Sequence, residues 1–413
     1  MANKHATLAA LFTDIADAIR EKTGDTASIV ADDFPDMIRN RLEAKPFKPS
    51  GEFYLTFSSP NSFTLKVKDT NKHWNGTLEY FSEDYTWTVW NGTTTLSSAV
   101  NKNENVIYLR GTGNTHITGD SRNNIGWVLT GSNILCLGNI ENLLDYATVA
   151  AGNHPMMRTY CYNYMFYGCT SLTQAPSLPA TKLASDCYNS MFAGCTSLTQ
   201  APILPATTLA SDCYRSMFLG CTSLTQAPIL PATTLADYCY RSMFAGCTSL
   251  TQAPSLPATT LEESCYDGMF QNCTSLTQAP SLSSTKLASN CYNSMFVGCT
   301  SLTQAPALPA TTLANFCYYY MFYNCTSLTQ VPSLPATTLA DYCYSAMFSG
   351  CNKIKVSSTQ TGEYTVVYRI PKSGTGTTAA NAFDRMFAST GGTFTGTPAI
   401  NTTYYLSNTN KVV

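Results

Sequence analysis

The chain has 413 residues, a formal net charge of −2 and a charged fraction of 12%, about half of the ~25% of an ordinary soluble domain. This length allows roughly two to four domains, and the hydrophobic fraction of 44% is sufficient for a packed core. The near-neutral charge argues against nucleic acid or an acidic membrane surface as the main partner. No run approaches the ~18 consecutive apolar residues of a membrane span, so we expect no membrane insertion.

The first 45 residues are predicted to form a helical attachment or oligomerisation segment. Apolar residues recur at helical spacing from residue 5 to residue 23, and Gly24 ends this helix. A second short helix is expected from Pro35 to Glu43, with Asp33 as its cap. Because two small helices cannot support a core alone, they must pair with copies of themselves or dock on another protein. The residues expected to make this attachment are Leu8, Leu11, Phe12, Ile15 and Ile19.

The same segment carries a resemblance to a known group of proteins. Residues 11–24 read LFTDIADAIREKTG and residues 29–35 read IVADDFP, and they resemble the N-termini of tail-associated proteins in phages and prophages of gut bacteria. The resemblance implies attachment to a virion, and the alternative is a helical hairpin packed on its own chain. Residues 1–24 lack a basic region followed by an apolar one. We therefore expect folding in a cytoplasm, unless a secretory signal was removed before residue 1.

Residues 46–125 are predicted to form a small antiparallel β-sandwich that acts as a spacer. Short runs alternate apolar and polar residues as half-buried strands do, and Asn-Gly pairs at 75–76 and 91–92 are turn signals between them. The predicted runs are Phe53 to Phe57, Phe63 to Val67, Thr77 to Phe81, Thr86 to Trp90 and Val106 to Leu109.

Residues 126–352 are predicted to form a repeat solenoid with an N-terminal cap. A 26-residue unit, CYxxMFx(G/N)CTSLTQAPxLPATxLAxx, occurs eight times in succession, and the eighth copy stops after its second cysteine. A fixed period of this size indicates coils that bury their apolar faces against one another. The units begin at Cys161, Cys187, Cys213, Cys239, Cys265, Cys291, Cys317 and Cys343. The residues expected to cover the open end before the first coil are Ile134, Leu135, Leu137, Ile140, Leu143 and Leu144.

Within one coil, residues 187–212, we expect a short helix followed by a parallel strand. The invariant apolar positions form one helical stripe, and they are Cys187, Tyr188, Met191, Phe192 and Cys195. The residues between them vary from copy to copy and are expected to lie outside. The strand is expected around Thr199 to Pro202, with one strand per coil. Because strands stack at roughly 4.8 Å and helices at roughly 8–10 Å, the solenoid should curve, and less so if the helix shrinks to a tight turn.

The sequence has 17 cysteines, of which 16 belong to the repeats. An odd number without a secretory signal argues against a disulfide framework. The eight-residue spacing within a unit would be roughly 12 Å along a helix, which is too long for a bridge. Metal spacing of the CxxC kind is absent, so we predict no metal site and small buried core residues.

The FxGCTSLT core of five of the eight units, followed three or four residues later by Leu-Pro, resembles the BspA-type leucine-rich repeat, whose units carry FxGCxSL. The similarity covers about half of the chain. The unit is slightly longer than the usual one, and its Pro-Ala-Thr stretch is distinctive. The resemblance implies a right-handed leucine-rich-repeat solenoid used for adhesion or recognition. The expected fold class is therefore an α/β repeat solenoid with a parallel strand and a short helix in each coil.

Residues 353–413 are predicted to form a β-rich C-terminal cap. Residues 353–370 have strand character, and the FDRMF sequence at 383–387 echoes the Met-Phe pair of the repeat without its cysteines. We expect a degenerate ninth coil that covers the far end of the stack.

No residue pattern predicts catalysis. A GxSxG elbow, a phosphate loop, a dinucleotide fingerprint and a zinc pattern are all missing from the sequence. The histidines lie outside the repeats, and the acidic cluster of Glu262, Glu263 and Asp267 has no readable geometry of a catalytic pair. We predict a protein that is not an enzyme and that needs no cofactor.

Tyrosines at the variable positions and a polar ladder are the candidate binding residues. A phenol ring has a flat apolar face and a polar tip, which suits sugars and protein surfaces alike. The alternative is that these rings pack on neighbouring subunits or on the caps. The Thr and Gln ladders could hydrogen-bond glycans or form a solvated sheet face. The candidates are Tyr164, Tyr167, Tyr319, Tyr320, Tyr323, Thr199, Gln200, Thr225 and Gln226.

These features lead to three hypotheses. The first is a phage tail protein, assembled in the bacterial host cytoplasm, that contacts other virion proteins through its N-terminus and a host glycan or protein through its repeats. The second is a BspA-like adhesin on the bacterial cell surface, which requires an export signal or an anchor. The third is a purely structural virion component. A homo-oligomer is expected, with a trimer suggested by analogy with tail fibres.

Overall fold

A computed structural model describes residues 48–69, 71–98, 104–119, 126–371 and 381–413, together with the single positions 17 and 21. The chain forms two compact units, residues 1–51 with 84–86 and residues 52–83 with 87–413, and nearly all described residues belong to the second. The predicted attachment residues Leu8, Leu11, Phe12, Ile15 and Ile19, and both predicted N-terminal helices, lie outside the described residues.

The strands predicted between residues 53 and 109 are present, with shifts of up to three residues at their ends. They are followed by two more strands and by α3 (Asn142–Ala150), the one helix in the described part of residues 48–413. The strands are β1 (Leu55–Ser58), β2 (Thr64–Val67), β3 (Thr77–Phe81), β4 (Trp87–Trp90), β5 (Leu96–Ser97), β6 (Val106–Thr112), β7 (Trp127–Thr130) and β8 (Ile134–Leu137).

These strands form two sheets, of which the larger continues into the repeats. Its order is β4-β3-β6-β1-β8-β9, where β9 (Leu172–Gln174) already belongs to the first coil. The strands from β4 to β8 pair antiparallel, whereas β8 and β9 pair parallel. The smaller sheet has the order β5-β2-β7. A separate β-sandwich is therefore not confirmed, because one sheet spans the boundary that the sequence predicted near residue 125.

The hydrophobic core is also continuous across this boundary. The ring of Trp127 lies 5.6 Å from that of Trp90, 6.3 Å from that of Phe57 and 6.2 Å from that of Phe166 in the first coil. Of the predicted cap residues, Ile134, Ile140, Leu143 and Leu144 are fully buried, while Leu135 and Leu137 are partly buried. The end of the stack is thus covered by β8 and the start of α3.

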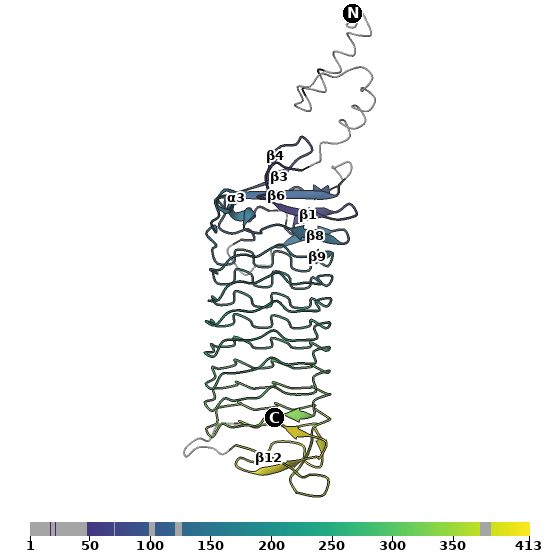
Figure 1. Ribbon diagram of the computed structural model, residues 1–413, viewed down its shortest axis with the longest axis vertical. Helices are drawn as coiled ribbons and strands as arrows, with labels where there is room; N and C mark the ends of the chain where they lie inside the picture. Colours follow the sequence, from purple (N-terminus) through teal and green to yellow (C-terminus); the bar gives the residue numbers. More distant parts are fainter. Residues whose placement is uncertain are drawn as a thin grey trace, which may run out of the picture. The chain divides into compact units, whose positions relative to one another are not determined.

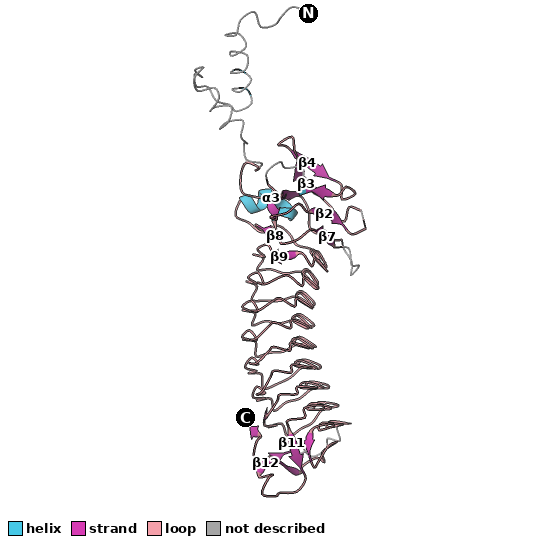
Figure 2. Cartoon of the chain, turned by 90° about the vertical axis from the view of Figure 1, so that its right-hand side faces the viewer, coloured by secondary structure: helices cyan, strands magenta, loops and turns pink. Residues whose placement is uncertain are grey.

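The short helix predicted in each coil is wrong, and a run of tight turns takes its place. In the second coil Asp186, Ser190 and Gly194 have φ of +55°, +53° and +75°, and the equivalent positions of the other coils are also left-handed. A residue with positive φ at every fourth position is incompatible with a right-handed helix. We call residues 186–194 and their equivalents the turn runs. Figure 2 shows the coils almost entirely as loops and turns.

Hydrogen bonds between coils explain why turns replace the helix. The N–H groups of Tyr188 and Ser190 donate to the next coil, to the carbonyls of Cys213 (3.0 Å) and Arg215 (2.8 Å). The N–H of Met191 lies between two donors that bond to the next coil, Ser190 and Phe192. It donates instead to the carbonyl of Tyr188 in its own coil and closes a turn. Half of the donors therefore bond as they would in a sheet, and the coils lie much closer together than packed helices would allow. Because no helix is present, the difference between helix and strand spacing that predicted a curved solenoid is absent as well. Figure 1 shows the coils as successive layers.

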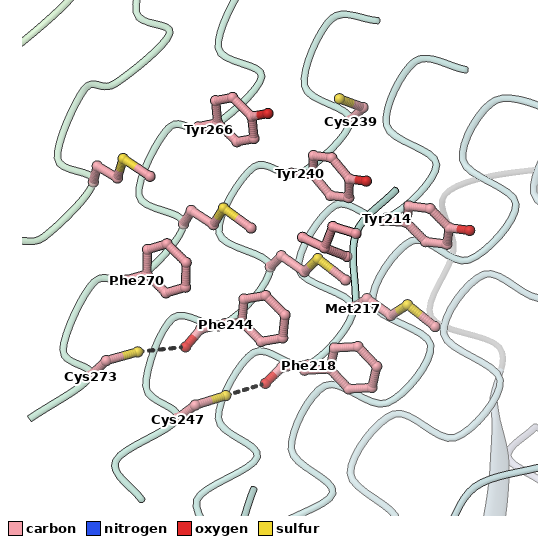
Figure 3. Packing of buried hydrophobic residues seen from close by; sticks show 14 of the residues in the cluster. Tyr214, Met217, Phe218, Cys239, Tyr240, Phe244, Cys247, Tyr266, Phe270 and Cys273 are labelled. Atoms are coloured by element: carbon pink, nitrogen blue, oxygen red, sulfur yellow. Dashed lines mark hydrogen bonds between the residues drawn. The ribbon is translucent and has the colours of Figure 1, made fainter. Parts of the chain in front are cut away.

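Each coil contributes one layer to ladders of identical side chains. Successive tyrosine rings, such as Tyr214 and Tyr240, stack with centroids 5.9 Å apart, and successive phenylalanine rings, such as Phe218 and Phe244, stack at 5.7 Å. Figure 3 shows these two ladders with the methionines between them. The second cysteine of a coil donates to the Phe carbonyl of the preceding coil, as Cys247 Sγ does to Phe218 O at 3.1 Å. Together these groups fill the interior of the stack.

The predicted strand in each coil is confirmed only in reduced form. Only the first and seventh coils have a strand at this position, β9 and β10 (Gln330–Val331). Most other coils are joined there by isolated parallel bridges, as between Gln200 and Gln226. Two prolines follow this position in the first seven coils except the fifth, which has one. Each proline lacks the N–H that a longer ladder would need.

The C-terminal residues continue the stack and then cover it. Tyr344 and Phe348 stack on Phe383 (5.5 Å) and Phe387 (5.9 Å), and Tyr344 N donates to Ala382 O. Residues 381–389 thus form a ninth layer without cysteines. A sheet of order β12-β14-β11-β13 follows, and β15 pairs parallel with β10. The bounds are β11 (Lys355–Ser357), β12 (Val366–Arg369), β13 (Gly391–Gly392), β14 (Thr403–Leu406) and β15 (Lys411–Val412).

Glycines that end the turn runs permit a test of the stacking. A Cβ at Gly350 (φ +79°) would lie 2.0 Å from Asn324 Oδ1 of the preceding coil, whereas a Cβ at Gly220 (φ +69°) would come no closer than 3.9 Å to any atom. We expect Gly220→Ala to cost about 1–2 kcal/mol from its left-handed backbone alone, and Gly350→Ala to cost at least about 1 kcal/mol more. Urea unfolding of both variants measures the difference.

The double variant Gly350→Ala/Asn324→Gly is the control. Removing the Asn324 side chain should return the cost of Gly350→Ala to that of Gly220→Ala. Equal costs for the two single variants would contradict the stacking contact.

Candidate functional site

The outer edge of the turn runs, which we call the turn face, carries the residues that differ between coils. Its positions in the second coil are Asn189, Ser190 and Ala193, and all three are buried, contrary to the expectation that variable positions lie outside. The close spacing of the coils explains this, because longer side chains of adjacent layers shield small ones. Large residues on the turn face, such as Tyr167 and Leu219, are the ones with exposed side chains.

The structure brings three of the predicted binding tyrosines together and adds two residues that the sequence analysis missed. Tyr319, Tyr320 and Tyr323 form one group with Phe316, which begins the same turn run, and with Tyr342, which begins the next one. We call these five residues the aromatic cluster. The missed residues occupy the same position of two successive units, one residue before the first cysteine. The sequence did contain a signal for the stacking of Phe316 and Tyr342, because aromatic residues at the same position of adjacent units come to lie in adjacent layers.

The rings of the aromatic cluster pack in a defined order. Phe316 and Tyr342 are stacked, with centroids 4.8 Å apart and planes 5° apart. Tyr319 stands edge-on to Phe316 at 5.5 Å and to Tyr320 at 4.2 Å. Tyr320 is edge-on to Tyr323 at 5.1 Å. Stacked and edge-to-face pairs are the favourable arrangements of aromatic rings, so the rings support one another.

The polar surroundings of the aromatic cluster come from the ninth layer. Asn381 Nδ2 donates to Tyr342 Oη at 2.8 Å, and Arg385 Nε donates to Asp384 Oδ2 at 3.2 Å. Burial, followed by the hydrogen bond with Tyr320, raises the pKa of Tyr319 to about 12. Its phenol therefore stays protonated near neutral pH and can donate a hydrogen bond.

The other two predicted tyrosines form a separate pair. Tyr164 and Tyr167 lie in the first coil, with ring centroids 5.4 Å apart, and Tyr167 is 43% exposed. Six 26-residue units separate this pair from Tyr319 and its neighbours. The five candidate tyrosines thus do not belong to one site.

The predicted polar ladder lies on a different edge of the coils. Thr199, Gln200, Thr225 and Gln226 are all exposed, and Gln200 bridges to Gln174 and Gln226. A cavity of about 580 Å³ lies beside Gln174 and Gln200 and is lined largely by Ala and Pro, with Ile203 80% exposed at its rim. A second cavity, of about 530 Å³, lies beside Gln278 and Gln304. No Asp, Glu, His, Lys, Arg or Cys side chain lines either cavity, so neither supplies a group for acid–base chemistry near neutral pH.

The thiols are buried and resistant to ionisation. All 17 cysteines are free and buried. Burial raises the pKa of each of them, for example that of Cys221 and of Cys239 to about 12. Because the thiolate is the reactive form, these cysteines are poor nucleophiles and poor metal ligands in the folded protein. Among the described residues, no group of three or more His, Cys, Asp or Glu is placed to hold a metal ion.

The middle coils carry a charged stripe on the turn face. Arg215 Nη1 lies 3.0 Å from Asp212 Oδ1, and Arg241 Nε lies 3.0 Å from Asp267 Oδ2. Burial raises the pKa of Asp267 from 3.8 to about 6, against the opposing effect of Arg241 and Arg215. The folded state thus prefers the protonated acid. The contribution of the protonated Asp267 carboxyl to the stability of the folded state is complete below about pH 4 and is lost as the pH rises through 6.

We therefore expect Asp267→Asn to stabilise the protein at neutral pH. The gain should be at most about 3 kcal/mol, reduced by the weaker contact with Arg241, and it should vanish as the pH falls to about 4. Thermal unfolding of both proteins across this pH range measures it. Glu262→Gln, at an exposed carboxylate, is the control and should change stability little at any pH. A gain of the same size at both pH values would contradict the assignment to Asp267.

Comparison with known proteins identifies the repeats. The model of the BspA type leucine rich repeat region matches residues 153–277 and 237–366, and together these stretches span slightly more than half of the 413 residues. No curated protein and no solved structure matches the chain. No helix in the described residues has both the length and the hydrophobicity that crossing a bilayer requires.

Proposed function

Because the chain belongs to the BspA-type leucine-rich repeat family, we propose that it is a non-catalytic recognition protein whose repeats present the turn face to a cell surface. One observation carries this proposal. The invariant residues of each coil fill the interior of the stack, whereas the aromatic cluster lies on the turn face outside the Tyr and Phe ladders. Partly exposed tyrosines are typical of binding hot spots.

The N-terminal resemblance supports a finer proposal about where the protein acts. A protein attached to a phage tail through residues 8–19 would hold its repeats toward the host cell, and a trimer would present several copies of the aromatic cluster at once. The family membership favours the alternative, an adhesin on a bacterial surface. Immunogold labelling of phage particles and of intact cells with an antibody to the repeats distinguishes the two. Label on particle tails supports the first, and label on cells without particles supports the second.

Binding of the labelled full-length chain to bacterial cells tests the recognition role itself. We expect the triple variant Tyr319→Ala/Tyr320→Ala/Tyr323→Ala to lose most of the binding. The double variant Tyr164→Ala/Tyr167→Ala removes tyrosines from the turn face of the first coil and serves as the control. Circular dichroism verifies that each variant folds. Undiminished binding by the folded triple variant would reject the aromatic cluster as the binding site.

A further inference from the structure

We propose that the aromatic cluster, together with Asn381, Asp384 and Arg385, is a binding site for a neutral saccharide. This inference rests on the proposed recognition function and names its ligand class. It depends on the arrangement of the five rings, on the mixed polar groups beside them, and on the low charge of the surrounding surface.

The aromatic rings hold one another in a pre-ordered arrangement, and each ring offers a flat apolar face. Tyr319 contacts three other rings of the cluster, at 4.2 Å (Tyr320), 5.5 Å (Phe316) and 6.3 Å (Tyr342), so its orientation is restricted before any ligand arrives. A ligand therefore orders few side chains when it binds, which reduces the entropy cost of association. The C–H groups on one face of a pyranose ring pack on such an aromatic plane.

The polar groups beside the rings favour hydroxyl groups as their partners. Asp384 accepts hydrogen bonds and Arg385 donates them, and the two side chains are in contact at 3.2 Å. Sugar hydroxyls both donate and accept, so neighbouring hydroxyls can use both side chains at once. Arg385 is 69% exposed at its side chain. Ser345 connects this pair to the rings, because Tyr320 N donates to Ser345 O (3.0 Å) and Ser345 Oγ donates to Asp384 O (3.1 Å).

The same pair argues against charged ligands. An acidic sugar would be attracted by Arg385 but repelled by Asp384, and a cationic ligand would experience the reverse. The opposite charges of Asp384 and Arg385 cancel locally, and the two adjoining repeats, residues 317–351, contain a single charged residue, Asp341. Little net attraction remains for either kind of charge. The phenol tips of Tyr319, Tyr320 and Tyr323 add further hydrogen-bonding groups, whereas a site for an apolar peptide would offer aliphatic side chains.

Isothermal titration of the full-length chain with defined oligosaccharides tests the proposal. The neutral probes are maltohexaose, cellohexaose, mannohexaose and xylohexaose, and the acidic probe is hexagalacturonic acid. We expect at least one neutral probe to bind, and Tyr319→Ala or Tyr320→Ala to weaken it by at least about tenfold, the range in which loss of a binding hot spot falls. Arg385→Gln should weaken it less, and Leu219→Ala, at an exposed turn-face side chain outside the aromatic cluster, should leave it unchanged.

Three outcomes would overturn the saccharide site. They are no binding of any neutral probe, binding of hexagalacturonic acid alone, or equal binding by the folded Tyr319→Ala and Tyr320→Ala variants. The proposed recognition function is judged separately by the cell-binding assay. Cell binding that depends on Tyr319, Tyr320 and Tyr323 without neutral saccharide binding would retain the function and reject the ligand class. Loss of both would reject the function as well.

Discussion

Raising the pH from about 8 to about 10 should unfold the repeats cooperatively. The pKa of the buried thiols lies at about 12 or higher in the folded chain, against 9.0 for an exposed thiol, because burial disfavours the thiolate. The unfolded chain therefore releases protons first. The stabilising contribution of each thiol is complete below pH 9 and is lost as the pH rises from 9 towards 12.

The number of thiols makes this effect large. Each buried thiol loses about 1.4 kcal/mol of stabilisation per pH unit above 9. Summed over the 17 buried cysteines, the loss at about pH 10 is on the order of 20 kcal/mol, which exceeds the ~5–15 kcal/mol of an ordinary folded domain. The tyrosine ladder adds to it at higher pH, since burial also raises the pKa of residues such as Tyr188 and Tyr344.

Circular dichroism and thiolate absorbance, followed together during a pH titration with a reductant present, measure the transition. We expect thiolate absorbance to rise and the native spectrum to disappear in one step, and both to recover on return to neutral pH. Thiolate absorbance that rises while the native spectrum persists would contradict the prediction, because the thiols would then ionise inside the folded stack.

Phe244→Ala should destabilise the protein by about 3–5 kcal/mol, the usual cost of removing a buried phenylalanine. Phe244 is fully buried in a middle coil, and its ring stacks between those of Phe218 (5.7 Å) and Phe270 (5.8 Å). Each layer contacts only its neighbours, so the damage should be concentrated in the adjoining coils. Urea unfolding gives the free energy, and mass spectrometry after brief alkylation locates the thiols that become accessible.

In the Phe244→Ala variant we expect Cys221, Cys247 and Cys273 to be alkylated before the cysteines of the first and last coils. Leu219→Ala, at a side chain of the turn face that is 38% exposed, is the control and should change neither stability nor labelling appreciably. Alkylation that begins at the ends of the stack, with the middle coils still protected, would contradict the nearest-neighbour account.

The turn runs mark the point where the sequence was misinterpreted. Apolar residues at i, i+1, i+4, i+5 and i+8 fit one face of a helix, but they also fit a strict period of four. Small or polar residues such as Asp186, Ser190 and Gly194 stand at every fourth position. They were the available sign of left-handed turns, since Asp, Asn and Gly tolerate positive φ better than most residues. Local sequence alone did not decide between the two, because the decisive hydrogen bonds join different coils.

The sequence predicted only part of the aromatic cluster, again because some of its contacts join different coils. Tyr319, Tyr320 and Tyr323 are recognisable within one unit because most other units have non-aromatic residues at these positions. Phe316 and Tyr342 belong to different units, and their contact follows only from the stacking of coils. The contribution of Asn381 requires in addition that residues 381–389 form a ninth layer.

The sequence by itself determined the period, the invariant apolar residues of the core and the repeat family, because each unit repeats the same apolar pattern and the burial of these residues follows from that pattern. The tertiary structure alone decided that turns replace helices, that one bridge replaces most strands, and that β15 pairs with β10. The physical reason is that backbone donors and acceptors must find partners, and in a stack those partners lie in the adjacent coil.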